Sequence, residues 1–275
     1  MKVSIITVTL NSAEFLEQCL QSVIAQHYSD IEHIIIDGGS TDATLDIICR
    51  YQPHIAQWVS EKDNGMYDAI NKGMRMATGN IIGTLNSDDM LASPDIISTI
   101  VKGFKSNKAD VVYGNIVYVE QNNIEKVIRV WNGDEYDRKK IEFGWMPAHP
   151  SFYINKNLIE RCGYYETHFY TAADYEFMTR YLYAHNVNAC YIPKLVVRMR
   201  SGGMSNVSIT RRLRANRRDY LAMKKNKIPF AMFISILKPL RKIYQFQNVF
   251  TSTIAHLFSN NQMPAFVPGE KTTAI

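Results

Sequence analysis

Residues 81–89, IIGTLNSDD, are the stretch from which the fold of this 275-residue chain is read. The apolar first half predicts a buried strand, and the run stops at two adjacent acids, Asp88 and Asp89. Three further strands are predicted before it, at residues 3–9 (a β-branched run), 31–36 and 55–60, with helical apolar spacing between them. Strand and helix therefore alternate four times, which is typical of an α/β fold with a mostly parallel central sheet.

Carboxylates follow two of these predicted strands. Asp37 comes directly after residues 31–36, and Asp88 and Asp89 come directly after the fourth strand. In a parallel sheet ligands bind outside the carboxyl ends of the strands, so we expect these acids on one rim. Adjacent acids repel each other, and a hard divalent cation that bridges nucleotide phosphates would explain the pair. A helix cap or a turn explains the pair equally well when it is taken alone.

Several classes of protein are excluded or disfavoured. The chain contains neither G-x-G-x-x-G after the first strand nor a P-loop, so a dinucleotide or P-loop phosphate site is unsupported. Its 46% hydrophobic and 21% charged residues indicate an ordered globular protein. The four cysteines form no C-x-x-C pair, which disfavours a zinc or redox motif and suits a reducing compartment. No leader pattern is evident, and we expect a cytoplasmic protein.

Positive charge is concentrated near the C-terminus. Residues Arg198 to Gln245 hold 13 Lys and Arg against one acid, Asp219, whereas the rest of the chain carries a net charge of −7. Aromatic residues such as Phe230 and Phe233 interleave with these cations. An amphipathic helix of this kind binds an anionic membrane surface, and no nucleic-acid-binding motif accompanies it, so we expect no nucleic acid partner. The alternative is a helical appendage that packs on the catalytic domain or on a second subunit.

Six stretches of the sequence, in order, make it recognisable: VSIITVTLN, IIIDGGSTDAT, EKDNGMYDAINKGMRMATGNIIGTLNSDD, MPAHPSFY, AADYEF and RMRSGGMSN. The combination resembles the family 2 glycosyltransferases of the GT-A fold, especially those that assemble bacterial exopolysaccharide (colanic-acid-type) or O-antigen chains. The resemblance implies a Rossmann-like GT-A catalytic domain over residues 1–206, followed by a basic amphipathic helical extension over 207–275. It also implies a nucleotide-sugar donor and Mg²⁺ or Mn²⁺ as cofactor.

The resemblance assigns roles in donor binding. Thr9 matches the segment that lines the nucleotide base, and Asp37 matches the acid that hydrogen-bonds it. Asp89 is expected to be the direct metal ligand, with Asp88 on the ribose or on a metal-bound water. Asn86 stands where many relatives have Asp, which removes one negative charge from the site.

Further donor contacts are implied around the third strand and near the end of the matched region. Asp63 and Asp68 are expected to contact the donor. Asn71 and Lys72 hold the loop or the phosphates, although a solvated helix face explains Lys72 as well. Arg200, with the glycine pair that follows it, resembles the flexible segment that closes on the diphosphate.

The resemblance assigns catalysis to Asp174. An acceptor hydroxyl has a very high pKa, and a positioned carboxylate can take its proton as it attacks the anomeric carbon. Ala173 stands where many relatives have Glu, and a helix cap is the alternative role for Asp174. Trp145 and His149 suit stacking and hydrogen bonding to an acceptor sugar, although a lone His is more often structural.

The sequence thus predicts an inverting transfer of a sugar to a saccharide or lipid-linked saccharide acceptor in cell-surface polysaccharide biosynthesis. With the basic tail, we expect a peripheral place on the inner face of the cell membrane. A sugar-phosphate nucleotidyltransferase and a non-catalytic nucleotide-sugar-binding protein are the two rivals. The first usually carries a Gly-rich basic loop after the first strand, where this chain has TVTLNSAEF.

Overall fold

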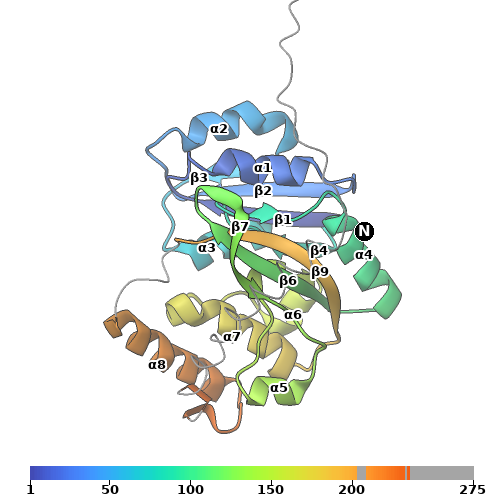
Figure 1. Ribbon diagram of the computed structural model, residues 1–275, viewed down its shortest axis with the longest axis vertical. Helices are drawn as coiled ribbons and strands as arrows, with labels where there is room; N and C mark the ends of the chain where they lie inside the picture. Colours follow the sequence, from blue (N-terminus) through green and yellow to red (C-terminus); the bar gives the residue numbers. More distant parts are fainter. Residues whose placement is uncertain (203–208, 233, 236–275) are drawn as a thin grey trace, which may run out of the picture.

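A curled, mostly parallel sheet forms the centre of the molecule (Figure 1). The computed structural model describes residues 1–202, 209–232 and 234–235. Over these residues nine strands form one sheet. The strands are β1 Val3–Thr9, β2 Ile31–Asp37, β3 Gln57–Ser60, β4 Ile81–Thr84, β5 Met90–Leu91, β6 Val111–Glu120, β7 Asn123–Trp131, β8 Tyr153–Asn155 and β9 Ala189–Arg200.

Helices and single helical turns connect these strands. The α-helices are α1 Leu16–Ile24, α2 Thr44–Tyr51, α3 Met66–Met76, α4 Ile96–Asn107, α5 Arg138–Glu142, α6 Leu158–Cys162, α7 Ala173–Thr179 and α8 Ile209–Lys225. The 3₁₀ turns are η1 Gln52–His54, η2 His149–Ser151 and η3 Thr167–Ala172, and the π-helical turn η4 Arg180–Ala184 extends α7.

The strand order is β3-β2-β1-β4-β8-β6-β9-β5, with β7 beside β6. The four strands predicted from residues 3–9, 31–36, 55–60 and 81–85 are β1 to β4, and they pair in parallel. β8 runs antiparallel to both of its neighbours, β4 and β6, while β9 is parallel to β6. The predicted α/β fold with a mostly parallel sheet is confirmed.

Helices cover both faces of β1 and β2, which explains why most residues of these two strands are buried. Ile35 packs with residues of α1 and α2, whereas Ile34 and Ile36 pack with residues of α3. Gly73 lets α3 approach the sheet closely, since a Cβ there would lie 2.4 Å from Cγ2 of Ile6. The parallel sheet is thus buried on both sides, as such sheets require.

Glu32 ties together the amino ends of the strands. Its carboxylate, only 2% exposed, accepts hydrogen bonds from Ser4 Oγ at 2.5 Å and Thr78 N at 2.7 Å. Lys2 Nζ lies 3.0 Å from the same carboxylate. Burial by itself would raise the pKa of Glu32, but these hydrogen bonds lower it to about 2. The amino ends of these strands are therefore fixed by hydrogen bonds, and the carboxyl ends remain as the place where a ligand can bind.

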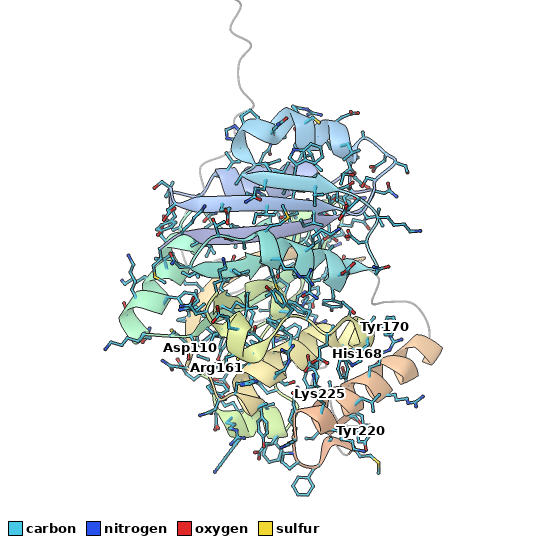
Figure 2. The ribbon with its side chains drawn as sticks, turned by 180° about the vertical axis from the view of Figure 1, so that it is seen from behind. Asp110, Arg161, His168, Tyr170, Tyr220 and Lys225 are labelled. Carbon is cyan, nitrogen blue, oxygen red and sulfur yellow. The ribbon has the colours of Figure 1, made fainter. Side chains whose placement is uncertain are left out.

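The described part of the C-terminal segment packs on the body of the protein. α8 lies beside α7 and η3, with Lys225 placed between the helix and the body (Figure 2). Ala222 and Met223 are fully buried, and Asn226 Nδ2 donates to Glu176 O at 3.1 Å. Residues 209–232 and 234–235 of the predicted extension therefore pack on the body of the protein, whereas its residues 207, 208, 233 and 236–275 lie outside the described residues. Within the described ranges, no helix is both long enough and apolar enough to cross a bilayer.

Candidate active site

The carboxyl ends of the parallel strands lie on one rim. Thr9 pairs with Asp37 in the register of β1 and β2, and Asp37 pairs with Ser60 of β3. Ile6 pairs with Thr84, so the loop with Asp88 and Asp89 begins at the same level. The predicted meeting of these acids at one edge of the sheet is thus present in the structure.

Hydrogen bonds join the loops of this rim. Ser12, after β1, contacts Ser87, after β4, with 2.9 Å between their hydroxyl oxygens. Asn11 N donates to Ser40 Oγ at 2.8 Å, which joins the loops after β1 and β2. The loops are therefore fixed relative to one another before any ligand binds, which lowers the entropic cost of binding.

Asp37 organises the turn that follows β2. Its carboxylate is fully buried and accepts hydrogen bonds from Gly39 N at 3.1 Å, Ser40 N at 2.9 Å and Ser60 Oγ at 2.6 Å. The described residues thus give Asp37 the turn-forming role, and its contact with a nucleotide base stays a prediction. Beside it, the hydroxyl of Thr9 is buried without a hydrogen-bond partner. An unpaired buried hydroxyl is costly, so Thr9 offers a polar contact that a ligand would satisfy.

The two acids after β4 differ in their surroundings. Asp89 is fully buried, and its carboxylate accepts hydrogen bonds from Asn86 Nδ2 at 2.8 Å and from the backbone N–H of Arg200 at 3.2 Å. Asp88, in contrast, is partly exposed. The Asn86 that replaces the more usual Asp therefore has a clear structural partner, because an amide can donate to Asp89 where a carboxylate would repel it.

Both carboxyl groups bind protons more tightly than an ordinary aspartate. Burial raises the pKa of Asp89 well above its usual range, and the charge of Asp88 adds to the increase. Burial also raises the pKa of Asp88, and the nearby Arg200 offsets part of that effect. A divalent cation at this pair would reverse the effect, since it stabilises the ionised carboxylates.

Arg200 is buried, with 4% of its surface exposed, and its guanidinium binds protein groups. Nη1 donates to the carbonyl of Asp88 at 2.6 Å, Nε donates to the carbonyl of Gln121 at 3.1 Å, and Nη2 donates to the side chain of Gln18. The guanidinium also lies over the ring of Phe15, at 4.7 Å. In the described structure the side chain of Arg200 therefore holds the Asp88 loop in place, and the closure of its segment on the diphosphate stays a prediction. Residue 203, the second glycine of that segment, lies outside the described residues.

The loop after β3 is held by ion pairs and hydrogen bonds. Lys72 Nζ lies 2.5 Å from Asp63 and 2.6 Å from Glu61, so Lys72 bridges this loop rather than lying on a solvated helix face. Asp68 accepts a hydrogen bond from Asn64 N at 3.0 Å at the start of α3. The buried Asn71 exchanges two hydrogen bonds with the backbone of Tyr165, at 2.8 and 2.9 Å. Donor contacts by Asp63 and Asp68 stay predictions.

Asp174 lies in the first turn of α7, next to His149 of η2. His149 Nδ1 is 3.5 Å from Asp174 Oδ2, and the two side chains are 22% and 19% exposed. Burial lowers the pKa of His149, with a partial offset from Asp174, so the imidazole is uncharged at neutral pH. The N-cap position of α7 is Ala172, so the described helix does not use Asp174 as its cap. The pairing of His149 with Asp174 was not predicted, because 25 residues separate them in the sequence.

A row of aromatic rings lies behind Asp174. Tyr67 of α3 stacks on Tyr165 with ring centroids 5.4 Å apart, and Tyr165 stacks on Phe177 at 3.9 Å. Burial raises the pKa of Tyr67 well above its usual value, the charge and the side chain of Asp174 add to the increase, and a hydrogen bond with the Asp174 backbone opposes it. Tyr67 is therefore a neutral hydroxyl near Asp174. Sequence reasoning passed over Tyr67, although it lies one position before Asp68 in the quoted family stretch.

Asp89 and the His149–Asp174 pair both adjoin β6. Asp89 accepts a hydrogen bond from Arg200 N, and Arg200 pairs with Val119 of β6. The turn η2, which contains His149, is attached to the same strand, because Ser151 Oγ donates to the carbonyl of Gly114 at 2.9 Å. Burial raises the pKa of Tyr118 on this strand, Arg129 opposes the increase, and Asp89 and Asp174 add to it. Trp145 packs edge-on against Tyr113, with 5.9 Å between the ring centroids. Acceptor contacts by Trp145 and His149 stay predictions.

The acids of the rim fit a magnesium or manganese ion bound mainly by its nucleotide. Among the described residues, no three His, Cys, Asp or Glu side chains form a cluster that could hold an ion on their own. Asp88 and Asp89 instead offer a pair of oxygen ligands, with pKa values raised by burial. Mg²⁺ characteristically takes one or two carboxylates and completes its shell with phosphate oxygens and water. The donor set thus suits a metal-nucleotide complex.

Sequence comparison identifies the family of this chain. The model of the family described as glycosyl transferase family 2 matches residues 4–169. A PGL/p-HBAD biosynthesis glycosyltransferase of Mycobacterium bovis is 30% identical over 211 residues, which cover 75% of this chain and 80% of that protein. An uncharacterized glycosyltransferase of Mycobacterium tuberculosis is 33% identical over 180 residues, or 65% of this chain and 68% of that one.

Solved structures share the fold. S. aureus TarS 1–349 in complex with UDP-GlcNAc has a TM-score of 0.62 at 18% identity and is matched over 82% of this chain and 66% of its own. Another TarS structure is matched over only 39% of its chain. The mannosyltransferase PcManGT from Pyrobaculum calidifontis, in complex with GDP-Man and Mn²⁺, has a TM-score of 0.61 at 18% identity, over 95% of this chain and 76% of that one. At this identity the likeness shows the fold alone, which is GT-A.

Proposed function

Because this chain belongs to glycosyl transferase family 2, we propose that it is an inverting, metal-dependent glycosyltransferase. It transfers a sugar from a nucleoside diphosphate to a hydroxyl group of a saccharide or a lipid-linked saccharide. The observation that carries the proposal is that both acidic groups adjoin β6: Asp89 accepts a hydrogen bond from Arg200, which pairs with Val119 of that strand, and Asp174 lies 3.5 Å from His149 of η2, a turn attached to the same strand. The proposed metal-diphosphate site and the proposed base therefore share one strand as support.

The family resemblance predicts Asp89 as the direct metal ligand. We propose Asp88 for this contact instead. Asp89 is fully buried, and its oxygens accept hydrogen bonds from Asn86 and from the backbone of Arg200. Asp88 is partly exposed on a loop that Arg200 fixes through its carbonyl. When bound, the cation would offset the negative charge that develops on the departing diphosphate.

The base in this proposal is Asp174. The acceptor oxygen forms a bond to the anomeric carbon while the bond from that carbon to the diphosphate oxygen breaks, and the bonding electrons leave with the diphosphate. The acceptor proton passes to a carboxylate oxygen of Asp174. His149 and Tyr67 lie near that carboxylate, and because both are uncharged, neither forms an ion pair with it. One base and a single displacement reverse the anomeric configuration.

The donor is proposed to bind along the rim between β1, β2 and β4. The unpaired hydroxyl of Thr9, beside the turn built by Asp37, offers a contact to the nucleotide base. Relatives of the same fold bind UDP-GlcNAc or GDP-Man, which supports a nucleotide sugar as donor here. The basic C-terminal segment supports a lipid-linked acceptor and a peripheral place on the inner face of the cell membrane, in cell-surface polysaccharide biosynthesis.

The test measures nucleoside diphosphate released from a panel of nucleotide sugars, with Mn²⁺ and a membrane extract as the source of acceptor. We expect Asp174→Asn to lower acceptor-dependent release by about 10²-fold or more, with donor binding unchanged. Asp46→Asn, an exposed acid on α2, is the matched control and should behave as wild type. Equal release by Asp174→Asn and Asp46→Asn would refute the base, and product of unchanged anomeric configuration, measured by NMR, would refute inversion.

A further inference from the structure

The segment that follows α8 exposes large apolar side chains. Phe230 is 79% exposed and Met232 is 70% exposed, and Leu221 on the outer face of α8 is 43% exposed. Single exposed apolar residues are ordinary on protein surfaces, but here three lie within twelve residues of chain. Lys227 and Phe230 both have positive φ angles, of 56° and 53°, so the turn that presents Phe230 is built from backbone conformations that such residues rarely adopt.

Phe230 and Met232 belong to a groove at the lower end of the molecule, where Tyr220 lies (Figure 2). Its lining residues, called the α8 groove below, are mainly apolar or aromatic, with two lysines and no acid: Tyr220, Lys224, Lys227, Ile228, Phe230, Ala231 and Met232. Both Lys224 and Lys227 are exposed. The groove thus combines an apolar floor with positive charge.

The opposite side of the same segment is attached to the body. Ala222, Met223 and Ile228 are buried in the main core cluster, and Lys225 pairs with Glu166 and with the fully buried Glu176. Asp219, the one acid of this basic stretch, is close enough to Tyr175 to raise its pKa. The groove is therefore held on a rigid support, and the acid of the segment lies toward the body.

We propose that the α8 groove binds an anionic phospholipid at the membrane surface. Lys224 and Lys227 contact the headgroup phosphate, and the side chains of Phe230 and Met232 insert at the acyl boundary. This deepens the membrane association that the proposed function includes and names the residues responsible. Charge complementarity selects an anionic lipid, since cations attract anionic headgroups and apolar side chains enter the interface. The chain that continues from this point carries Lys238, Arg241 and Lys242, so it is unsuited to cover the lysines of the groove and suited to the same surface.

The test is co-sedimentation of the full-length protein with vesicles of phosphatidylglycerol and phosphatidylcholine, compared with vesicles of phosphatidylcholine alone. We expect binding to the anionic vesicles only, weakened by salt. Lys224→Glu/Lys227→Glu should lower the partition coefficient by at least about 25-fold, from about five-fold for each lysine near an anionic surface. Phe230→Ser/Met232→Ser should also lower it, and both variants should fold because the altered side chains are exposed.

Phe143→Ser is the matched control. Phe143 is 69% exposed, and the nine residues before it, 134–142, hold four acids against three bases and so give no net positive charge, which is why its loss should leave vesicle binding unchanged. Equal binding by wild type and the groove variants, equal binding to neutral vesicles, or an equal loss in Phe143→Ser would each overturn the groove. Nucleoside diphosphate release with a water-soluble acceptor separates this proposal from the enzymatic one, since the groove variants should retain it.

Discussion

Replacing Arg200 by Met tests whether this residue holds the Asp88 loop or serves only to bind the donor. The change removes three hydrogen bonds from the guanidinium, to the carbonyls of Asp88 and Gln121 and to the side chain of Gln18. Hydrogen bonds from a charged group contribute about 1.5–3 kcal/mol each and are not additive. Because the side chain is buried and two carbonyls lose a partner, we expect a loss of about 3–5 kcal/mol in the free energy of unfolding.

The assay is urea denaturation without metal or nucleotide, so that donor binding cannot contribute. Arg198→Met is the matched control on the same strand, because Arg198 is partly exposed and donates a long hydrogen bond, of 3.3 Å, to the carbonyl of Ile124. We expect that change to cost about 1 kcal/mol or less. Equal denaturation midpoints for wild type and Arg200→Met would refute the structural role of Arg200 and leave donor binding as its role.

Three other predictions concern charge and packing. Because the pKa values of Asp88 and Asp89 are raised in the metal-free fold, that fold keeps protons that the unfolded chain loses above about pH 4, and the pair destabilises the fold as the pH rises toward the raised pKa values. The increase in Tm on adding Mn²⁺ and nucleoside diphosphate should therefore be larger at about pH 8 than at about pH 5. An equal increase at the two pH values would contradict this prediction. Glu32→Gln should cost about 2–3 kcal/mol in urea denaturation at neutral pH, and the difference from wild type should shrink as the pH falls from 4.5 toward 2, because the lowered pKa of Glu32 stabilises the fold only where the carboxylate is ionised. Asn226→Ala should lower Tm, because it removes hydrogen bonds that attach the end of α8 to α7, whereas Asn216→Ala within α8 should not. Equal Tm values for the two variants would contradict the packing of α8 on the catalytic domain.

The sequence predicts β1, β2 and β4 well because each contains a run of β-branched residues that is mostly buried, and β3 follows from its place in the alternation of strands and helices. It does not predict β5 and β8, which have two and three residues and therefore show no periodicity. Their pairing depends on partners far along the chain, as with Met90 beside Arg198. Local pattern is thus sufficient for the parallel half of the sheet and insufficient for the mixed half.

The candidate site shows the same division. The acids at strand ends are visible in the sequence, because composition and position along the strand suffice to find them. The sequence does not distinguish Asp88 from Asp89, since neighbouring residues on a loop have no alternation that assigns one to the interior. The partners of Arg200 also escaped prediction, because Asp88 lies 112 residues away. A charge can be found from composition, but its contacts require the fold.

The central claim is that a metal-diphosphate site at Asp88 lies within reach of the base Asp174. The most direct measurement is a crystal structure with Mn²⁺ and a nucleotide sugar, in which anomalous scattering locates the ion. We expect the manganese about 2.1 Å from a carboxylate oxygen of Asp88, with the anomeric carbon on the side of Asp174. An ion that does not contact Asp88, or a sugar whose anomeric carbon is turned away from Asp174, would contradict this claim.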